Sequence, residues 1–359
     1  MFKEEAVVLH INKGRGAVSN ATGRFESLQR EEFDDGWFQE EREPPKTEII
    51  ADRSRSIITY NQSPDVPFDR SINPYKGCEH GCSYCFARPT HAYLGYSPGL
   101  DFETKIVAKH DARELLEKEL RKPGYKPAVV ALGANTDAYQ PVERKLEITR
   151  GILGLLAEFR HPVTIITKSA LIERDLELLA SMAKENLVRV AISITSLHNS
   201  VGRKLEPRAA TPKRRLQLVK TLSEAGIPVS VLFAPVIPGF NDEELEQVLT
   251  GAKEAGADEA NYVLLRLPLE TAELFYQWLE LNEPLKAQRI INLIRDARGG
   301  NDYDTAFGSR MRGTGAYAAV IEKRFKLTSK RLGLNARSGA LDTRRFRIPK
   351  RCSKQLSLF

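Results

Sequence analysis

From about residue 65 the chain alternates short, β-branched apolar runs with longer amphipathic stretches, and this alternation restricts the possible folds most strongly. Strands that alternate with helices form parallel sheets, because each crossover returns the chain to the same edge. Six strands are expected, at Ser71–Tyr75, Ala128–Leu132, Val163–Thr167, Val188–Ile194, Val229–Phe233 and Asn261–Leu265. The helices expected between them are Ala112–Arg121, Glu143–Phe159, Glu173–Lys184, Pro212–Glu224 and Asp242–Glu254. We therefore predict an α/β fold with an open partial (βα)6 barrel rather than a full eight-unit barrel.

Four segments follow from this pattern. Residues 1–65 are polar and interrupted by Gly, Asn and Pro, which predicts an irregular N-terminal leader. Residues 66–267 hold the partial barrel, 268–322 a helical extension with helices at Glu270–Leu281 and Pro284–Arg298, and 323–359 a basic tail. No run approaches the roughly 18 apolar residues that span a bilayer, so we expect a cytoplasmic protein without a membrane partner.

Charge is distributed unevenly along the chain. The formal net charge is +7, but Lys323–Lys354 alone holds twelve Lys or Arg and one acid, which leaves the remainder slightly acidic. A basic tract of this density indicates an anionic partner, with nucleic acid the first candidate and acidic protein or lipid surfaces behind it. The alternative is a solvated arm that only aids solubility.

Three of the four cysteines lie within eight positions, in the segment CEHGCSYC, as Cys78, Cys82 and Cys85. This crowding does not resemble a disulfide framework. Thiolate clusters favour zinc or iron–sulfur, and a structural zinc site would take a fourth ligand such as His80 or His91. No second CxxC pair is present, and the loop follows a strand, where barrel folds carry their chemistry.

The CxxxCxxC spacing ahead of a (βα)6 pattern resembles the radical S-adenosylmethionine (radical SAM) superfamily. The resemblance implies that Cys78, Cys82 and Cys85 bind three irons of a [4Fe–4S] cluster and leave the fourth iron to S-adenosylmethionine. Reductive cleavage of that cofactor would then generate a 5′-deoxyadenosyl radical, which the protein directs at one hydrogen of its substrate. An electron donor such as flavodoxin or ferredoxin is implied as a partner.

The same resemblance assigns cofactor contacts by position. Tyr84 would lie near the adenine, Thr136 and Asp137 at the amino group, Lys168 at the carboxylate, Ser193 and Thr195 at the ribose, and the backbone of Ile237 and Gly239 at the adenine. Each has an ordinary structural alternative: a core tyrosine, an Asx turn that caps a helix, polar residues at strand ends, and a strand-to-helix turn.

Within the superfamily, the stretches SINPYKGCEHGCSYCFARPTHAYLG and NTDAYQPVE look most like the spore photoproduct lyase group. In that group the adenosyl radical acts on a thymine dimer in DNA, and a cysteine after the second strand returns a hydrogen. Ala134 takes the place of that cysteine here, so thymine-dimer repair itself is not predicted. Tyr139 is our candidate catalytic relay, with Tyr93 as a second.

Two further features point to DNA. The terminal residues Gln355, Leu356, Ser357, Leu358 and Phe359 resemble the peptide by which bacterial repair proteins bind the DNA sliding clamp. Contacts at the barrel mouth are expected from Arg88, His91, Arg203 and Arg208. The alternative for these four residues is ion pairing at the surface or at strand ends. The predicted protein is thus a nucleoid-associated radical SAM enzyme that acts on damaged or modified DNA and is recruited by the clamp. The alternatives are the same enzyme class acting on RNA or protein, and a non-enzymatic, metal-stabilised adaptor between DNA and clamp.

Overall fold

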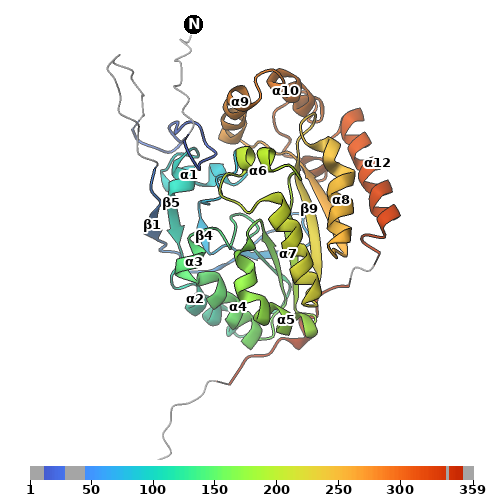
Figure 1. The fold of residues 1–359 in the computed structure, drawn as a ribbon. Helices are drawn as coiled ribbons and strands as arrows, with labels where there is room; N and C mark the ends of the chain where they lie inside the picture. Colours follow the sequence, from blue (N-terminus) through green and yellow to red (C-terminus); the bar gives the residue numbers. More distant parts are fainter. Residues whose placement is uncertain (1–11, 29–44, 337–338, 351–359) are drawn as a thin grey trace, which may run out of the picture.

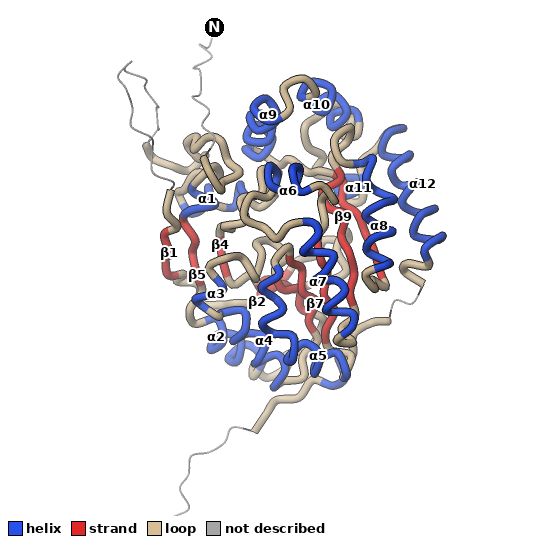
Figure 2. The backbone as a smooth tube through the Cα atoms, in the orientation of Figure 1, coloured by secondary structure: helices blue, strands red, loops and turns tan. Residues whose placement is uncertain are grey.

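A computed structural model describes residues 12–28, 45–336 and 339–350. Its main sheet has seven strands in the order β10-β9-β8-β7-β6-β3-β2 (Figures 1 and 2). Six are parallel: β3 (Arg70–Ile72), β6 (Val130–Leu132), β7 (Val163–Thr167), β8 (Val188–Ser193), β9 (Val229–Val236) and β10 (Glu259–Leu264). Strand β2 (Ile58–Tyr60) pairs antiparallel with β3. The prediction of six parallel strands in an open partial barrel is confirmed.

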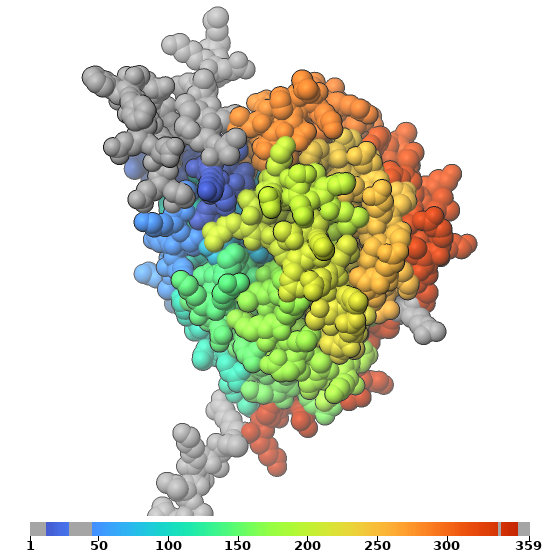
Figure 3. Space-filling view, viewed as in Figure 1, coloured from blue at the N-terminus to red at the C-terminus, as the bar shows by residue number. Residues whose placement is uncertain are grey.

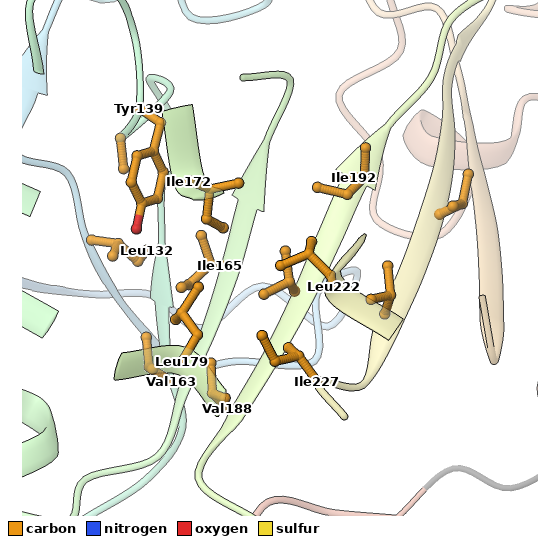
Figure 4. Close-up of a cluster of buried hydrophobic side chains, with 14 of the residues drawn as sticks. Leu132, Tyr139, Val163, Ile165, Ile172, Leu179, Val188, Ile192, Leu222 and Ile227 are labelled. Carbon is orange, nitrogen blue, oxygen red and sulfur yellow. The ribbon is translucent and has the colours of Figure 1, made fainter. Parts of the chain in front are cut away.

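Helices cover the outer face of this sheet (Figures 1 and 3). The covering helices are α2 (Ala112–Leu120), α4 (Ile148–Glu158), α5 (Leu176–Lys184), α7 (Pro212–Glu224) and α8 (Leu245–Glu254). Their apolar faces and the strands form the main core, part of which Figure 4 shows around Ile165, Ile192 and Leu222. Burial of such side chains contributes about 1.5–3 kcal/mol each and is the main force holding the layers together.

One predicted helix is interrupted. Instead of a continuous helix over Glu143–Phe159, the chain forms α3 (Glu143–Leu146) and α4, separated by Glu147 at φ 50°. The reason is local, because the carboxylate of Glu143 accepts a hydrogen bond from the Thr149 amide at 3.0 Å. It thus satisfies a backbone donor at the start of α4 and stabilises a second helix start.

The leader is less irregular than expected. It contains β1 (Glu48–Ala51), which pairs in parallel with β5 (Lys105–Ala108), as well as strand β2. Strand β4 (Tyr75–Lys76) completes this second sheet in the order β1-β5-β4. Only pairing partners some 55 residues away turn β1 into a strand, so local sequence pattern does not reveal it.

The described residues after β10 are mainly helical, with α9 (Glu270–Asn282), α10 (Ala287–Asp296), the short α11 (Ser309–Arg312) and α12 (Gly315–Leu332). Helix α12 packs beside α8 and runs through the expected boundary at residue 323. The last described stretch crosses the N-terminal edge of the strands, where the Arg347 amide donates to the Phe159 carbonyl at 3.0 Å. The peptide at 355–359 lies outside the described residues. Among described helices, none is both long and apolar enough to cross a membrane.

Candidate functional site

The three cysteines lie in a loop that follows β4, beyond the C-terminal end of strand β3. Cys78 and Cys82 are 7% and 8% exposed, Cys85 is half-buried, and all three are free thiols. The loop folds back on itself, since the Gly81 amide donates to the Cys78 carbonyl at 3.4 Å and the Cys85 amide to the Cys82 carbonyl at 3.3 Å. Within the described ranges, no three His, Cys, Asp or Glu side chains are grouped to hold a single ion.

A buried ion pair supports the loop from beneath. The guanidinium of Arg88 donates twice to the Cys82 carbonyl oxygen, at 3.0 and 2.8 Å, and pairs with Glu103 at 2.5 Å. Both side chains of the pair are fully buried. The expectation that Arg88 lines the barrel mouth is therefore wrong. Glu103, fifteen residues away, neutralises the charge that made Arg88 look like a surface residue.

The leader packs directly on this loop. The Glu103 carboxylate accepts hydrogen bonds from the amides of Gly16 and Ala17, at 3.0 and 2.8 Å. A Cβ on Gly16 would stand 1.7 Å from the Gly81 carbonyl oxygen, so only glycine fits there. Further along the chain, the Gln140 side chain bonds the Glu79 amide at 2.9 Å and the Gly77 carbonyl at 3.1 Å. These contacts fix the loop backbone from two sides.

Glu206 and Arg215 form a second buried ion pair, next to Tyr84. The Tyr84 hydroxyl donates to the Glu206 carboxylate and lies 3.3 Å from the hydroxyl of Thr195. Arg215 also donates to the Ser193 carbonyl at 2.9 Å. Burial works against ionisation of Glu206, but Arg215 and Lys168 outweigh it and bring the pKa of Glu206 to about 2.

Sequence analysis missed this pair. Neither residue lies in a recognisable motif. The only sequence feature that could have indicated the pair is an acidic and a basic residue nine positions apart, on either side of the start of helix α7 (Pro212–Glu224). The pair brings together three predicted residues, Tyr84, Ser193 and Thr195, because it touches all of them. It therefore joins the cysteine loop to the end of strand β8.

Lys168 is the free cation of the site among the described residues. It follows β7 and is half-buried, and within the described part of the chain its ammonium has no recorded hydrogen bond or ion pair. Burial lowers the pKa of Lys168, yet the negative charges of Cys82 and Glu206 more than offset this and raise it above its ordinary value. Lys168 thus remains charged beside the thiols and is available to an anionic group.

Asp137 and Thr136 are engaged with the protein itself. The Asp137 carboxylate accepts from the amides of Tyr139 and Lys168, both at 2.8 Å, and from the Thr167 hydroxyl at 2.7 Å. His80 lies 3.3 Å from it. Burial raises the pKa of Asp137, but His80 and these donors bring it to about 2. Thr136 donates to the Tyr75 carbonyl at 2.6 Å. The Asx-turn alternative therefore describes the contacts of Asp137.

The remaining predicted contacts lie at the ends of β8 and β9. The Ser193 hydroxyl donates to the Ala234 carbonyl at 3.0 Å. The Ile237 amide donates to the Asn241 side chain at 2.7 Å. Gly239 has φ 71°, and its amide donates to Asp242 at 2.7 Å. This turn is built as a strand-to-helix connection, with its backbone donors already used.

Tyr139 points into the core rather than toward the cysteine loop. It is fully buried, lies beside Leu132 and Ile172 in Figure 4, and donates its hydroxyl to Asp175 at 2.9 Å. Burial and the Asp175 charge raise the pKa of Tyr139 well above its ordinary value. These contacts are those of a structural tyrosine. Tyr93, by contrast, is 69% exposed.

The other expected mouth residues have different surroundings. His91 is fully buried against Phe102, and burial lowers its pKa to about 4, so the expectation of a nucleic-acid contact is wrong for it. Arg203 is exposed on α6 (Asn199–Leu205). Arg208 lies 3.2 Å from Glu79 in the cysteine loop.

The donor set fits an iron–sulfur cluster. One tight loop supplies three soft thiols, and Cys82 and Cys85 both lie close enough to Cys78 to act on its pKa. Thiols are the ligand type that such clusters take. Burial raises the pKa of Cys82 to about 12 even though Lys168 lowers it, so this thiolate needs additional positive charge close by. Cluster irons would supply that charge, and Lys168 stands on the same side.

A family model of the radical SAM superfamily matches residues 72–250, which include the cysteine loop and the first five parallel strands bar the start of β3. An uncharacterised protein of Mycobacterium tuberculosis is 40% identical over 232 residues, 64% of this chain and 68% of that protein. The chain belongs to the radical SAM superfamily. It is an enzyme of the radical SAM type, and members of this superfamily use a [4Fe–4S] cluster and S-adenosylmethionine.

Solved structures place the fold within that superfamily. A spore photoproduct lyase variant aligns with a TM-score of 0.56 and 14% identity over 80% of each chain. Another variant of that lyase, with bound S-adenosylmethionine and dinucleoside spore photoproduct, aligns with a TM-score of 0.51 and 15% identity over 80% of each chain.

A more distant relative in sequence is a Thermus thermophilus tRNA-2-methylthio-N(6)-dimethylallyladenosine synthase, which is 22% identical over 224 residues, 61% of this chain and 45% of that enzyme.

Proposed function

We propose that Cys78, Cys82 and Cys85 hold a [4Fe–4S] cluster and that Lys168 pairs with the carboxylate of S-adenosylmethionine beside it. The observation that carries this proposal is that three free thiols lie at the same edge of the sheet as Lys168, whose ammonium has no hydrogen bond or ion pair among the described residues. When bound, the cluster and S-adenosylmethionine supply a 5′-deoxyadenosyl radical. No other anion among the described residues forms an ion pair with Lys168.

The chain's own residues position and shield this site. The Glu206–Arg215 pair holds Tyr84 and Thr195 in place, and the Arg88–Glu103 pair holds the Cys82 backbone. Because both pairs are fully buried, they are fixed before any ligand arrives, and little reorganisation is needed on binding. Ser193, Thr195 and the Ile237–Gly239 turn form the adjoining wall on which the nucleoside part would rest.

The proposed substrate is DNA with a damaged or modified base. Support comes from the basic tract, in which Lys323, Lys330 and Arg331 are exposed on α12, and from the dinucleoside photoproduct bound by the lyase that shares this fold. Some arginines of the basic tract are neutralised by acidic residues of the barrel helices, as in the ion pair of Arg324 with Glu246 on α8 at 2.6 Å. Thymine-dimer repair is not proposed, since Ala134 stands where the lyase group has its hydrogen-returning cysteine.

RNA is the second candidate, on one observation. A relative at 22% identity is named as a tRNA-modifying synthase, and phosphate contacts from a basic tract do not distinguish DNA from RNA.

We further propose that residues 355–359 bind the sliding clamp and that this association places the protein at the nucleoid. A flavodoxin or ferredoxin is the proposed electron donor. The clamp peptide rests on sequence alone.

The test is anaerobic purification followed by iron, sulfide and zinc analysis of the chain and of a Cys78→Ala, Cys82→Ala, Cys85→Ala triple variant. About four irons and four sulfides per chain, lost in the variant, are expected. One zinc without iron would contradict the cluster and favour the adaptor alternative.

Substrate class is tested separately with the loaded protein, reductant and S-adenosylmethionine. Lesion-bearing DNA and a matched RNA are supplied in turn, and 5′-deoxyadenosine is quantified. Stimulation by DNA above the RNA value supports the proposal, and stimulation by RNA alone would replace DNA with RNA.

A further inference from the structure

Phe86 lies next to the cysteine loop and faces outward. It directly follows Cys85 and is 40% exposed. The guanidinium carbon of Arg266, two residues beyond the end of β10, stands 5.1 Å from the centre of its ring. The same carbon is 5.8 Å from the ring of Tyr303, whose hydroxyl accepts a hydrogen bond from Arg266 at 3.1 Å. These three side chains, here called the platform, join the loop, the last parallel strand and the segment before α11.

The platform is positively charged. Arg266 has no carboxylate partner among the described residues, and its buried Nε has no hydrogen-bond acceptor. Arg298 and Arg312, on neighbouring segments, bond backbone carbonyls and one amide oxygen rather than acids. An arginine without an ion pair beside an exposed ring suits a ligand that has both a flat face and negative charge.

The patch continues away from the loop. Phe307 is 60% exposed, and the guanidinium of Arg310 stands 4.6 Å from its ring. Arg310 differs from Arg266 because Asp65 neutralises it. Exposed rings at Phe86 and Phe307, each with an arginine over its face, suit the unstacked bases of a single strand better than they suit a duplex.

A second arginine and aromatic cluster provides a contrast. Arg24 lies over the rings of Phe25 and Tyr93, at 5.3 and 5.6 Å, but it is paired with Glu270 at 2.5 Å. The positive charge of Arg24 is therefore already neutralised within the protein, by Glu270. Among the described residues no carboxylate pairs with Arg266 in the platform; Asp65, which pairs with Arg310, acts on it only from further away. A negatively charged ligand can therefore pair with this guanidinium.

We infer that the platform of Phe86, Arg266 and Tyr303 binds an unstacked nucleobase of a single-stranded nucleic acid and so holds the substrate strand beside the cysteine loop. This inference rests on the proposed nucleic-acid substrate and deepens it by naming how the strand is held. Phe86 is the residue after Cys85, so a base stacked there sits at the entrance to the site. Phosphates of the same strand would lie beside Arg266, which has no ion pair among the described residues.

The experiment uses the full chain loaded with its cluster under anaerobic conditions. Fluorescence anisotropy measures binding of a labelled twelve-nucleotide single strand, and ultraviolet cross-linking of the same strand carrying 5-iodouracil maps the residue in contact. Phe86→Leu and Tyr303→Leu remove one ring each and keep an apolar side chain. Tyr60→Leu on β2 is the matched control, because its exposed ring lies under Arg70, which is paired with Asp69 at 2.7 Å. Iron content verifies that each variant retains the site.

We expect Phe86→Leu and Tyr303→Leu each to weaken single-strand binding about tenfold. Tyr60→Leu should bind like the parent chain, and cross-links should map to the peptide that contains Phe86 or Tyr303. If the parent binds the strand but both platform variants bind equally well, the inference is overturned and the nucleic-acid substrate stands. If the parent binds neither single-stranded DNA nor RNA, both fall.

Discussion

Gly16 and the carbonyl oxygen of Gly81 are in direct contact, with no room for a side chain between the leader and the cysteine loop. A Cβ on Gly16 would stand 1.7 Å from that oxygen. We expect Gly16→Ala to destabilise the chain by about 1–3 kcal/mol, because backbone on both sides must move. The amount of iron that the Gly16→Ala variant retains after desalting should also fall, because the cysteine loop is displaced. Gly339→Ala, where a Cβ meets nothing within 4 Å, is the control. Unchanged iron retention in Gly16→Ala would contradict the contact.

Replacing Lys168 should separate cofactor binding from cluster binding. Lys168→Met removes the unpaired ammonium but leaves the thiols, so iron content should be preserved. Affinity for S-adenosylmethionine, measured by equilibrium dialysis without reductant, should fall about tenfold or more. Lys204→Met is the matched control, because Lys204 is exposed and pairs with Glu283 at 3.0 Å. Equal affinity in the Lys168 and Lys204 variants would remove Lys168 from the cofactor site.

Tyr139→Phe distinguishes a structural tyrosine from a catalytic relay. Loss of the hydroxyl that donates to Asp175 should cost about 1–2 kcal/mol in the free energy of unfolding, measured with urea. Asp175 keeps its ion pairs with Arg150 and Arg174, which limits the loss. The yield of 5′-deoxyadenosine and of product per chain should stay near the parent value. A variant that cleaves cofactor but forms no product would restore the relay role.

His161 should make the fold sensitive to mild acid. It is fully buried, and burial lowers its pKa to about 4 from an ordinary value of 6.5. Between these values the unfolded chain binds a proton that the folded chain does not, so stability is complete above pH 6.5 and is lost as the pH falls toward 4. The loss is roughly 3 kcal/mol.

His161→Phe tests this contribution, since the rings of Tyr125 and Phe346 lie 5.9 and 5.5 Å from the His161 ring and can pack against another aromatic side chain. The free energy of unfolding should drop less between pH 7.5 and 4.5 in the variant than in the parent. Parallel curves for the two proteins would mean that other groups carry the acid sensitivity. His91 contributes in the same direction and should remain in both curves.

Some elements were predictable to the residue, and the reason is local. Strand β7 and helix α7 have the expected bounds, Val163–Thr167 and Pro212–Glu224. In the second case the Thr211 hydroxyl accepts from the Arg214 amide at 3.4 Å, so the cap and the first-turn proline mark the start. When the residues that determine the start or end of an element lie within a few positions of it, the sequence pattern alone predicts that boundary.

Features that depend on distant partners were not predictable. Arg88 is buried because Glu103 and the Cys82 carbonyl neutralise and satisfy it, and no spacing rule brings these together. Glu206 and Arg215 are likewise paired only by the fold. The three cysteines were found because their spacing alone encodes a binding loop. The sequence pattern thus located the cysteine loop, whereas the buried ion pairs that hold this loop in place could be identified only from the structure.

The last described residues run along the N-terminal edge of the strands, where Arg121 donates to the Pro349 carbonyl at 3.0 Å. The cysteine loop is at the opposite edge. A partner that binds residues 346–350 would therefore stand at the edge opposite the cysteine loop and leave that loop unobstructed. Binding there and turnover would be independent, and an oligonucleotide too short to span the molecule should be processed equally fast whether or not residues 346–350 are occupied.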